Sequence, residues 1–274
     1  MNAPPVPGPA PGSAPRSADA GLTGRTAVVT GAAGGIGRAC GLRLAAAGAR
    51  VRAVDRDAEG LADLVAFAER TVRTPGTVEA YALDLTDLDA AERAAEGADI
   101  LVNNAGMQFV RPIDEFPPEV FSRMLTVMLE APFRLVRGAL PGMYERGWGR
   151  IVNISSVHGL RASAYKSAYV AAKHGLEGLS KTAALEGAPH GVTSNCVNPG
   201  YTRTPLVERQ IADQAAAHGI SEERVVSEVL LADAAVKRLV EPEEVAEAVA
   251  YLCGPHASFI TGTSLSMDGG WTAH

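Results

Sequence analysis

Residues 26–37 read Thr-Ala-Val-Val-Thr-Gly-Ala-Ala-Gly-Gly-Ile-Gly, a pattern typical of a strand, a glycine-rich turn and the start of a helix. Its apolar first part, residues 26–30, predicts a buried strand, and the Ala- and Leu-rich residues 38–47 predict a helix. The glycines between them let the backbone approach a pyrophosphate, and the helix N-terminus faces the negative charge of that group. The G-x-x-x-G-x-G spacing is looser than the dinucleotide fingerprint G-x-G-x-x-G. No Lys-Ser/Thr pair closes the turn, which excludes a nucleoside-triphosphate P-loop.

An acidic residue follows the next predicted strand, residues 51–54. This residue, Asp55, lies eighteen positions past Gly37, where a carboxylate can accept hydrogen bonds from the ribose hydroxyls of the cofactor. It would also repel a 2′-phosphate, so the sequence favours NAD over NADP. Arg56 acts in the opposite direction, because an Arg after this strand can accept that phosphate. Asp55 could instead cap a helix, a role that Asp57 could also fill.

Strand-like and helix-like segments alternate along the rest of the chain. Further strands are predicted at 78–83, 100–102, 150–154, 193–198 and 264–267, and helices at 87–95, 119–146, 168–185, 206–217, 222–232 and 242–253. This alternation predicts an α/β fold of the Rossmann type, a doubly wound parallel sheet of about seven strands in one domain, residues 23–274. Residues 206–232 are expected to form a substrate lid. Residues 1–22, rich in Pro, Ala, Gly and Ser, are expected to form a disordered tail.

Composition narrows the class of protein further. The chain has 274 residues, is 47% hydrophobic and carries a net charge of -6 without a basic cluster, which argues against a nucleic-acid partner. No apolar run is long enough to span a membrane, and no secretory signal precedes the domain. Three scattered cysteines indicate the reducing cytoplasm, and six histidines without metal-ligand spacing predict that no metal is bound.

Ser156, Tyr169 and Lys173 are the candidate catalytic residues. Tyr169 and Lys173 are four apart in a predicted helix, so they share one face, and Ser156 follows the strand 150–154. A free phenol has a pKa of ~10, and a three-unit decrease requires ~4 kcal/mol, which a nearby ammonium can supply in a partly dry site. Tyr169 could then exchange a proton with a hydroxyl or carbonyl oxygen that Ser156 also contacts. A Y-x-x-x-K spacing alone also occurs by chance on ordinary helices.

Five motifs in this order resemble the short-chain dehydrogenase/reductase family over residues 24–272. They are the Thr30-Gly31 turn, Asn103-Asn104-Ala105-Gly106, Ser156, Tyr169 with Lys173, and Asn198-Pro199-Gly200. The resemblance implies a nicotinamide cofactor, a Ser-Tyr-Lys site and a homotetramer. The residues it assigns to the cofactor are Gly31, Gly35, Ile36, Gly37, Asp55, Asp84, Leu85, Asn104, Ala105, Gly106, Tyr169, Lys173, Pro199, Gly200 and Thr202.

Two features depart from the family pattern. The segment between Asp84 and Asn103 is about ten residues shorter than usual, which predicts a reduced crossover helix. Met128 replaces an Asn that in the family supports a water next to the catalytic lysine, so either a backbone carbonyl or another water path serves, or proton exchange is slower. In the same predicted helix, Pro132 is expected to produce a kink, because proline removes one hydrogen bond of the ladder.

A group of polar residues predicts a small carboxylate as the substrate. Four polar side chains are expected around the pocket, and their groups suit a carboxylate: Gln108, His158, Lys166 and Gln210. The chain resembles the D-3-hydroxybutyrate dehydrogenase subgroup of the family at residues 156–160, 166–175 and 205–211. This resemblance implies that the four polar side chains bind the carboxylate of the substrate and that Tyr201 and Trp271 enclose its methyl end. The predicted substrate-binding residues are Gln108, Ser156, His158, Lys166, Tyr169, Tyr201, Gln210 and Trp271.

Other interpretations remain open at this point. Lys166 and Gln210 could be solvated loop residues and His158 could cap a turn. Tyr165 lacks a Lys four positions later, which removes it as a candidate for the catalytic phenol. The main hypothesis is NAD-dependent oxidation of (R)-3-hydroxybutyrate, or a similar small 3-hydroxy acid, to acetoacetate. Alternatives are a reductase of 3-oxoacyl thioesters, a dehydrogenase of other secondary alcohols, and a non-catalytic NAD-binding scaffold.

Overall fold

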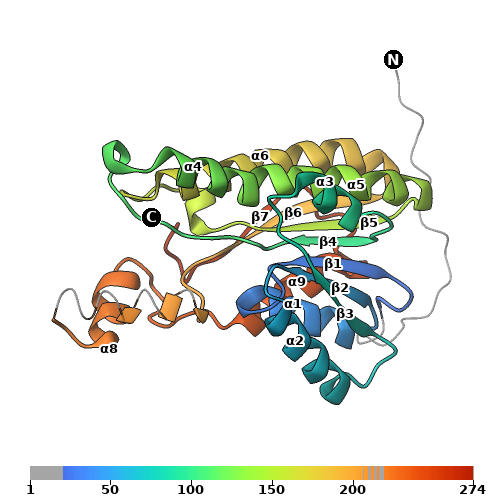
Figure 1. Ribbon diagram of the computed structural model, residues 1–274, viewed down its shortest axis with the longest axis horizontal. Coiled ribbons are helices and arrows are strands. Elements are labelled where there is room, and N and C mark those ends of the chain that lie inside the picture. Colours follow the sequence, from blue (N-terminus) through green and yellow to red (C-terminus); the bar gives the residue numbers. More distant parts are fainter. Residues whose placement is uncertain (1–20, 206, 209–210, 213–214, 216–218, 274) are drawn as a thin grey trace.

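The computed structural model describes residues 21–205, 207–208, 211–212, 215 and 219–273. It contains a seven-stranded parallel sheet with the strand order β3-β2-β1-β4-β5-β6-β7, which confirms the predicted Rossmann-type fold (Figure 1). The strands are β1 (Thr26–Thr30), β2 (Arg50–Asp55), β3 (Thr77–Ala82), β4 (Ile100–Asn103), β5 (Gly149–Ile154), β6 (Val192–Pro199) and β7 (Ser264–Met267). The order reverses between β1 and β4, the switch point at which ligands bind in open α/β sheets.

Helices cover both faces of the sheet. On one face lie α1 (Gly35–Ala46), α2 (Ala58–Thr71) and α9 (Pro242–Cys253); on the other lie α3 (Leu88–Ala94), α4 (Pro118–Leu125), α5 (Ala131–Arg146) and α6 (Ser167–Gly187). Strand β1 shows how the sequence supports both layers. Ala27 and Val29 pack into the cluster under α1 and α9, whereas Val28 packs into the cluster under α5. A strand buried on both sides must be apolar throughout, which explains its continuous hydrophobic run.

The predicted helix 119–146 is divided into three parts. Between α4 and α5 the chain forms a π-helical turn, Thr126–Glu130, in which the N–H of Ala131 donates to the carbonyl of Thr126. The next residue, Pro132, has no N–H, so the regular ladder is interrupted where the turn widens. The structure therefore accommodates Pro132 with a π-turn, which also carries Met128.

The N-terminal boundary and the lid differ from the predictions. Leu22 is buried in the core and its N–H donates to the carbonyl of Ala47, so the domain extends into the stretch assigned to the tail. Residues 1–20 lie outside the described residues. In the predicted lid, the second helix consists of the short α8 (Glu222–Arg224) and a π-turn (Val225–Leu230), and Figure 1 shows α8 apart from the sheet. Much of the first helix, 206–217, lies outside the described residues.

Gly37 is where the turn after β1 tolerates no side chain. A Cβ at Gly37 would overlap the carbonyl oxygen of Gly31 and the amide of Asn104, whereas a Cβ at Gly34 would meet nothing within 4 Å. We expect Gly37→Ala to lower the free energy of unfolding by about 1–3 kcal/mol, the usual cost of overpacking. Urea denaturation followed by circular dichroism measures this free energy for wild type and variant. Gly34→Ala is the matched control, and equal stability of the two variants would contradict this packing argument.

Candidate active site

A cleft of about 590 Å³ runs along the carboxyl ends of the strands at the switch point. Its lining includes predicted residues from the whole length of the domain: Gly31, Gly35, Ile36, Asp55, Asn104, Ala105, Gly106, Ser156, Tyr169, Lys173, Pro199, Gly200 and Thr202. An adjoining cavity of about 150 Å³ adds Asp84 and Leu85. Gly37 does not line either cavity, and its place is against the backbone of Gly31.

The cleft has the groups that a dinucleotide requires. Among the described residues no side chain caps the N-terminus of α1, so its first N–H groups can bind an anion. Asp55 lies at the end of β2 and its carboxylate accepts from the N–H of Ala33 at 3.0 Å, which holds it beside the glycine turn. The helix cap is Asp57, which accepts from the N–H of Gly60 at 3.0 Å. Of the two roles left open for Asp55, its position favours ribose binding.

Asn104 holds the backbone of the glycine turn through hydrogen bonds. Its side-chain amide donates to the carbonyls of Thr30 and Gly31 at 2.9 and 3.2 Å. The hydroxyl of Thr30 in turn accepts from the N–H groups of Asn104 and Ala105 at 3.0 and 3.1 Å. These bonds tie the end of β1 to the end of β4 and fix the floor of the cleft.

Ser156, Tyr169 and Lys173 meet at the inner end of the cleft. All three line it, and the ammonium of Lys173 lies 5.6 Å from the centre of the Tyr169 ring. Ser156 follows β5 and is held by Asn198 of β6, whose amide donates to the Ser156 carbonyl at 2.9 Å and to the carboxylate of Glu177 at 2.6 Å. Tyr169 and Lys173 project from α6, as their spacing predicts.

The pKa of Tyr169 does not shift in the direction that the sequence predicted. Burial has the largest effect on Tyr169 and raises its pKa, while a hydrogen bond with Ser156 lowers it and Tyr201 raises it. Burial also lowers the pKa of Lys173 to about 8. The ammonium of Lys173 donates to the carbonyl of Ile154 at 2.7 Å. The expected depression of the Tyr169 pKa is therefore not found in the protein alone, because burial raises this pKa and Lys173 is not among the groups that shift it.

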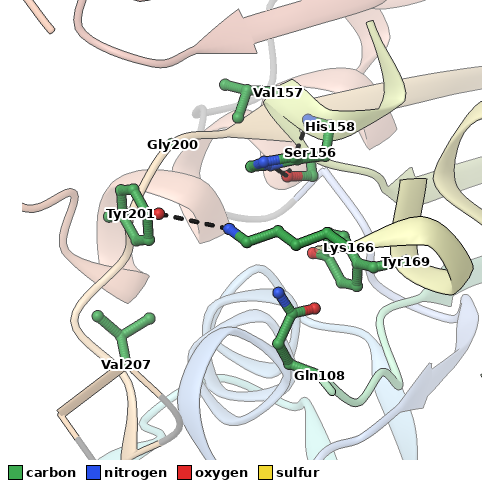
Figure 2. Close-up of a pocket in the computed structure, with 9 residues that line it drawn as sticks. All are labelled: Gln108, Ser156, Val157, His158, Lys166, Tyr169, Gly200, Tyr201 and Val207. Carbon is green, nitrogen blue, oxygen red and sulfur yellow. Dashed lines mark hydrogen bonds between the residues drawn. The ribbon is translucent and has the colours of Figure 1, made fainter. Parts of the chain in front are cut away.

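A smaller cavity of about 90 Å³ opens beside these residues (Figure 2). It is well above the ~10–15 Å³ that one water needs, and well below the ~300–1,000 Å³ typical of clefts for drug-sized ligands. Six of the eight predicted substrate-binding residues line it, together with Val157, Gly200 and Val207: Gln108, Ser156, His158, Lys166, Tyr169 and Tyr201. Its size and lining suit a ligand of a few heavy atoms.

Lys166 and Gln108 have polar atoms in this cavity that are available to bind a ligand. The ammonium of Lys166 extends across the cavity to the hydroxyl of Tyr201, a weak contact of 3.4 Å. The amide of Gln108 points toward the same space, and its buried oxygen has no hydrogen-bond partner among the described residues. The ammonium of Lys166 and the NH₂ group of Gln108 are donors that suit the oxygens of a small anion, whereas the unpaired Gln108 oxygen can only accept a hydrogen bond.

The backbone sets the direction of the Lys166 side chain. Tyr165, directly before it, has a φ of 68° and is the one non-glycine residue with positive φ in the described chain. The carbonyl of Tyr165 accepts from the N–H of Arg111 at 3.0 Å, and α6 begins one residue after Lys166. Lys166 is thus held between a left-handed residue and a helix, so its position is not that of a freely solvated loop lysine.

His158 is buried and uncharged near neutral pH. Burial lowers its pKa to about 4, with smaller effects from Lys166 and His174. Its ring stacks on Trp271 at 5.8 Å and meets the Tyr169 ring edge-on at 5.9 Å. The turn at residues 157–159 is capped by Ser156, whose hydroxyl accepts from the N–H of His158 at 3.2 Å, so His158 is not the cap.

The two remaining predicted substrate-binding residues, Trp271 and Gln210, are not found in the lining of the smaller cavity. Trp271 lines a neighbouring cavity of about 130 Å³ and reaches the smaller cavity only through its contact with His158. Gln210 lies outside the described residues. The sequence argument missed Val157, Val207 and Ser163. Val207 belonged to a string chosen for its resemblance, but no spacing in the sequence connects Ser163 with the site.

Within the described residues, no three His, Cys, Asp or Glu side chains come together in a way that could hold a metal ion. Among those residues, no helix is both long and apolar enough to cross a membrane.

Comparison with known proteins agrees with this geometry. The family model for short-chain dehydrogenases matches residues 25–215. A D-beta-hydroxybutyrate dehydrogenase of Rhizobium meliloti is 48% identical, with 91% of this chain and 99% of the relative covered, and one of Cupriavidus necator is 41% identical, with 92% and 99% covered. Among solved structures, L-sorbose reductase of Gluconobacter frateurii, complexed with NADPH and L-sorbose, has a TM-score of 0.87 at 30% identity, covering 93% of this chain and 99% of its own.

Proposed function

Since the chain belongs to the short-chain dehydrogenase/reductase family, we propose that it oxidises a small 3-hydroxy acid, in the first place (R)-3-hydroxybutyrate, reversibly to the 3-oxo acid with NAD. The observation that carries the proposal is that the Lys166 ammonium and the Gln108 amide line one small cavity with Ser156 and Tyr169. The relatives named D-beta-hydroxybutyrate dehydrogenase support the same substrate class.

The residues divide into binding and proton-transfer roles. Lys166 attracts the carboxylate and Gln108 donates to it, while the uncharged His158 contributes a hydrogen bond and not a charge. This arrangement leaves the 3-hydroxyl of the substrate beside Tyr169 and Ser156. The bound cofactor supplies the acceptor for the hydride. Tyr169 takes the hydroxyl proton and Ser156 hydrogen-bonds the same oxygen. The role proposed for Lys173 is to favour the phenolate in the complex with cofactor and substrate, an effect that the protein alone does not have.

A substrate panel tests the proposal. Purified protein is incubated with NAD or NADP and with 3-hydroxybutyrate, longer 3-hydroxy acids, neutral secondary alcohols and a 3-hydroxyacyl thioester, and reduced cofactor is followed by absorbance. We expect 3-hydroxybutyrate with NAD to give the highest kcat/KM. A preference for the thioester would support the acyl reductase alternative. Binding of NAD without reduction by any substrate would support a non-catalytic scaffold.

Asp55 is proposed to select NAD. We expect Asp55→Asn to lower the ratio of kcat/KM for NAD to that for NADP by about 10–100-fold, since a charge next to a phosphate is worth ~1.5–3 kcal/mol. The Asn side chain can still accept from the N–H of Ala33, so the turn keeps its support. Asp87→Asn, at a helix cap outside both cofactor cavities, is the matched control. An unchanged ratio in Asp55→Asn would assign the selection to another residue, with Arg56 next in position.

The predicted homotetramer remains a proposal. Apolar side chains on two helices of one face support association, because Phe133 of α5 and Leu185 of α6 are 48% and 79% exposed. Light scattering after size-exclusion chromatography measures the number of subunits.

A further inference from the structure

Glu177 is a buried carboxylate that the proposed reaction leaves without a role. It is 4% exposed and lies on α6 four positions after Lys173 and eight after Tyr169. Residues four apart share one face of a helix, so α6 directs the phenol, the ammonium and the carboxylate toward the same side. Burying a carboxylate is unfavourable unless its oxygens and its charge find partners, so the partners of Glu177 indicate what it does.

Both oxygens of Glu177 accept short hydrogen bonds from neighbouring strands. The amide of Asn198 on β6 donates to one oxygen at 2.6 Å, and the hydroxyl of Ser264 on β7 donates to the other at 2.6 Å. For an O–H donor, a distance of about 2.5–2.7 Å is typical of an ionised acceptor. Neither donor carries a charge, so these bonds fix the two oxygens without neutralising them.

Through Asn198, Glu177 acts on the segment that carries Ser156. The same amide group of Asn198 donates to the carbonyl of Ser156 at 2.9 Å. The carboxylate and the carbonyl can only accept, so the amide must face both of them with its NH₂ group. Lys173 holds the same segment two residues earlier, since its ammonium donates to the carbonyl of Ile154 at 2.7 Å. One face of α6 therefore fixes this segment at two points, at one of them through Asn198.

The turn after Ser156 also packs against Glu177. The N–H of Gly159 donates to the carbonyl of Ser156 at 2.9 Å, which closes this turn. A Cβ at Gly159 would lie only 3.0 Å from an oxygen of Glu177 and 3.2 Å from its Cγ. Glu177 thus supports Ser156 from two directions, through the amide of Asn198 and through the turn.

The negative charge of Glu177 bears on Lys173, one helical turn away. Burial lowers the pKa of Lys173 to about 8, while Cys196 and Glu177 raise it against that effect. Two other ionisable groups face Lys173, Cys196 on β6 and Tyr169 on α6, and burial raises the pKa of both, so neither is charged near neutral pH. Glu177 is therefore the source of negative charge that favours the protonated form of Lys173.

In the described part of the chain, the other elements packed against α6 bring no further charge to Lys173. From β5 comes the carbonyl of Ile154, and from the π-turn comes buried Met128, whereas Glu130 of that turn is exposed. His158, after β5, is uncharged near neutral pH. The ionisable side chains of α4 and α5 are not among the groups that shift the pKa of Lys173: Glu119, Arg123, Arg134, Arg137, Tyr144, Glu145 and Arg146.

We propose that Glu177 is a positioning residue for the oxidation, which fixes Ser156 through Asn198 and holds a negative charge next to Lys173. The inference rests on the proposed function, since it concerns the step in which Tyr169 takes the substrate proton. Glu177 lines neither the substrate cavity nor the cofactor cleft, so it acts through residues that do. A Gln could make the same hydrogen bonds, so the effect of the charge can be measured apart from that of the bonds.

Glu177→Gln tests the charge in the full chain without cofactor. The Gln oxygen can accept from Asn198 and its NH₂ group can donate to the Ser264 hydroxyl, so the variant loses the charge and keeps the bonds. Carbon NMR of the lysine side chains gives the pKa of Lys173, which should fall from about 8 by about one pH unit or more. The chain has four lysines, so variants of the other three assign the signal.

The same change predicts a pH-dependent loss of activity. Lys173 is charged below its pKa, so at pH 6 wild type and Glu177→Gln should have nearly equal kcat for 3-hydroxybutyrate, or for the best substrate of the panel. With the pKa lower by about one, the charged fraction of Lys173 at pH 8 is about fivefold smaller, and kcat should fall by a similar factor. KM for the acid should not change, because the carboxylate is bound by other residues.

Two further variants of Glu177 separate the hydrogen bond from the charge. Glu177→Asp keeps the charge but is one carbon shorter, so Lys173 should titrate as in wild type, while the weakened bond to Asn198 lowers kcat by a factor that does not vary with pH. Glu177→Ala loses both and should show both effects. Glu186→Gln is the matched control, because Glu186 is exposed near the end of α6, and it should change neither the pKa of Lys173 nor kcat.

Three results would overturn the inference. They are an unchanged Lys173 pKa in Glu177→Gln, a loss of kcat in that variant that is equal at pH 6 and pH 8, and wild-type kcat in Glu177→Ala. Circular dichroism establishes that each variant is folded, and a loss of structure alone would not produce a loss that grows with pH. If the wild-type protein oxidises no substrate, the proposed function fails, and the NMR titration still decides whether Glu177 controls the charge of Lys173.

Discussion

Replacing Tyr169 by Phe is expected to lower kcat for the proposed oxidation by about 10²–10⁴-fold, the range attributed to a positioned acid or base. The substitution removes one oxygen from a ring that packs in an apolar cluster, so the fold should remain intact. Affinity for the cofactor should change little, because the glycine turn and Asp55 lie at the other end of the cleft. Turnover is measured at saturating NAD, and NAD affinity by fluorescence titration.

The control for this variant is Tyr165→Phe. Tyr165 lies four residues earlier, is 59% exposed and lines neither cofactor cavity nor the substrate cavity. It loses the same hydroxyl while its backbone conformation is kept, and kcat should equal that of wild type. Retention of more than a few per cent of activity in Tyr169→Phe would mean that another group accepts the proton.

Replacing Lys166 by Met is expected to raise KM for 3-hydroxybutyrate by about 10–100-fold. A charge-assisted hydrogen bond contributes ~1.5–3 kcal/mol, and tenfold in binding corresponds to ~1.4 kcal/mol. The effect should be confined to acids, since a neutral secondary alcohol of similar size has no group for Lys166 to bind. Steady-state kinetics with both substrates measures this difference.

Lys181→Met provides the matched control, because Lys181 lies exposed on α6, the helix that begins directly after Lys166, and does not line the substrate cavity. Its KM for both substrates should equal that of wild type. An equal loss for acid and alcohol in Lys166→Met would indicate a distorted cavity. An unchanged KM for the acid would remove Lys166 from the carboxylate site.

The fold was accessible from the sequence because its signals are local and repeated. A strand buried on both faces must be apolar, and a turn that approaches a phosphate must be glycine-rich, so β1 was predicted with its correct boundaries. The helix after the turn was predicted to begin at residue 38, but α1 begins at Gly35. The strand 264–267 and the helix 242–253 also agree with the structure. The π-turn was not accessible, because Pro132 signals a lost hydrogen bond but not how the helix accommodates it.

The residues of the site were predicted less completely than the fold, because spacing in the sequence reveals neighbours within one helix but not neighbours that turns bring together. Residues separated by four positions on a helix must be neighbours, so Tyr169 and Lys173 could be paired from spacing alone. Ser163 and Val207 reach the site through turns whose course depends on distant packing, and spacing carries no such information. The prediction of a lowered Tyr169 pKa was wrong for a related reason, because the sequence reveals a nearby ammonium but not the burial that raises this pKa.

The left-handed backbone at Tyr165 has a consequence for affinity. An ordinary lysine loses considerable rotational freedom when it binds an anion, and immobilising such a side chain costs about 0.5–1.5 kcal/mol. At Lys166 the main chain is already fixed by Tyr165 on one side and α6 on the other, and the side chain already spans the cavity. Part of that entropic cost is therefore met during folding, so a ligand of only a few heavy atoms can be held by few contacts.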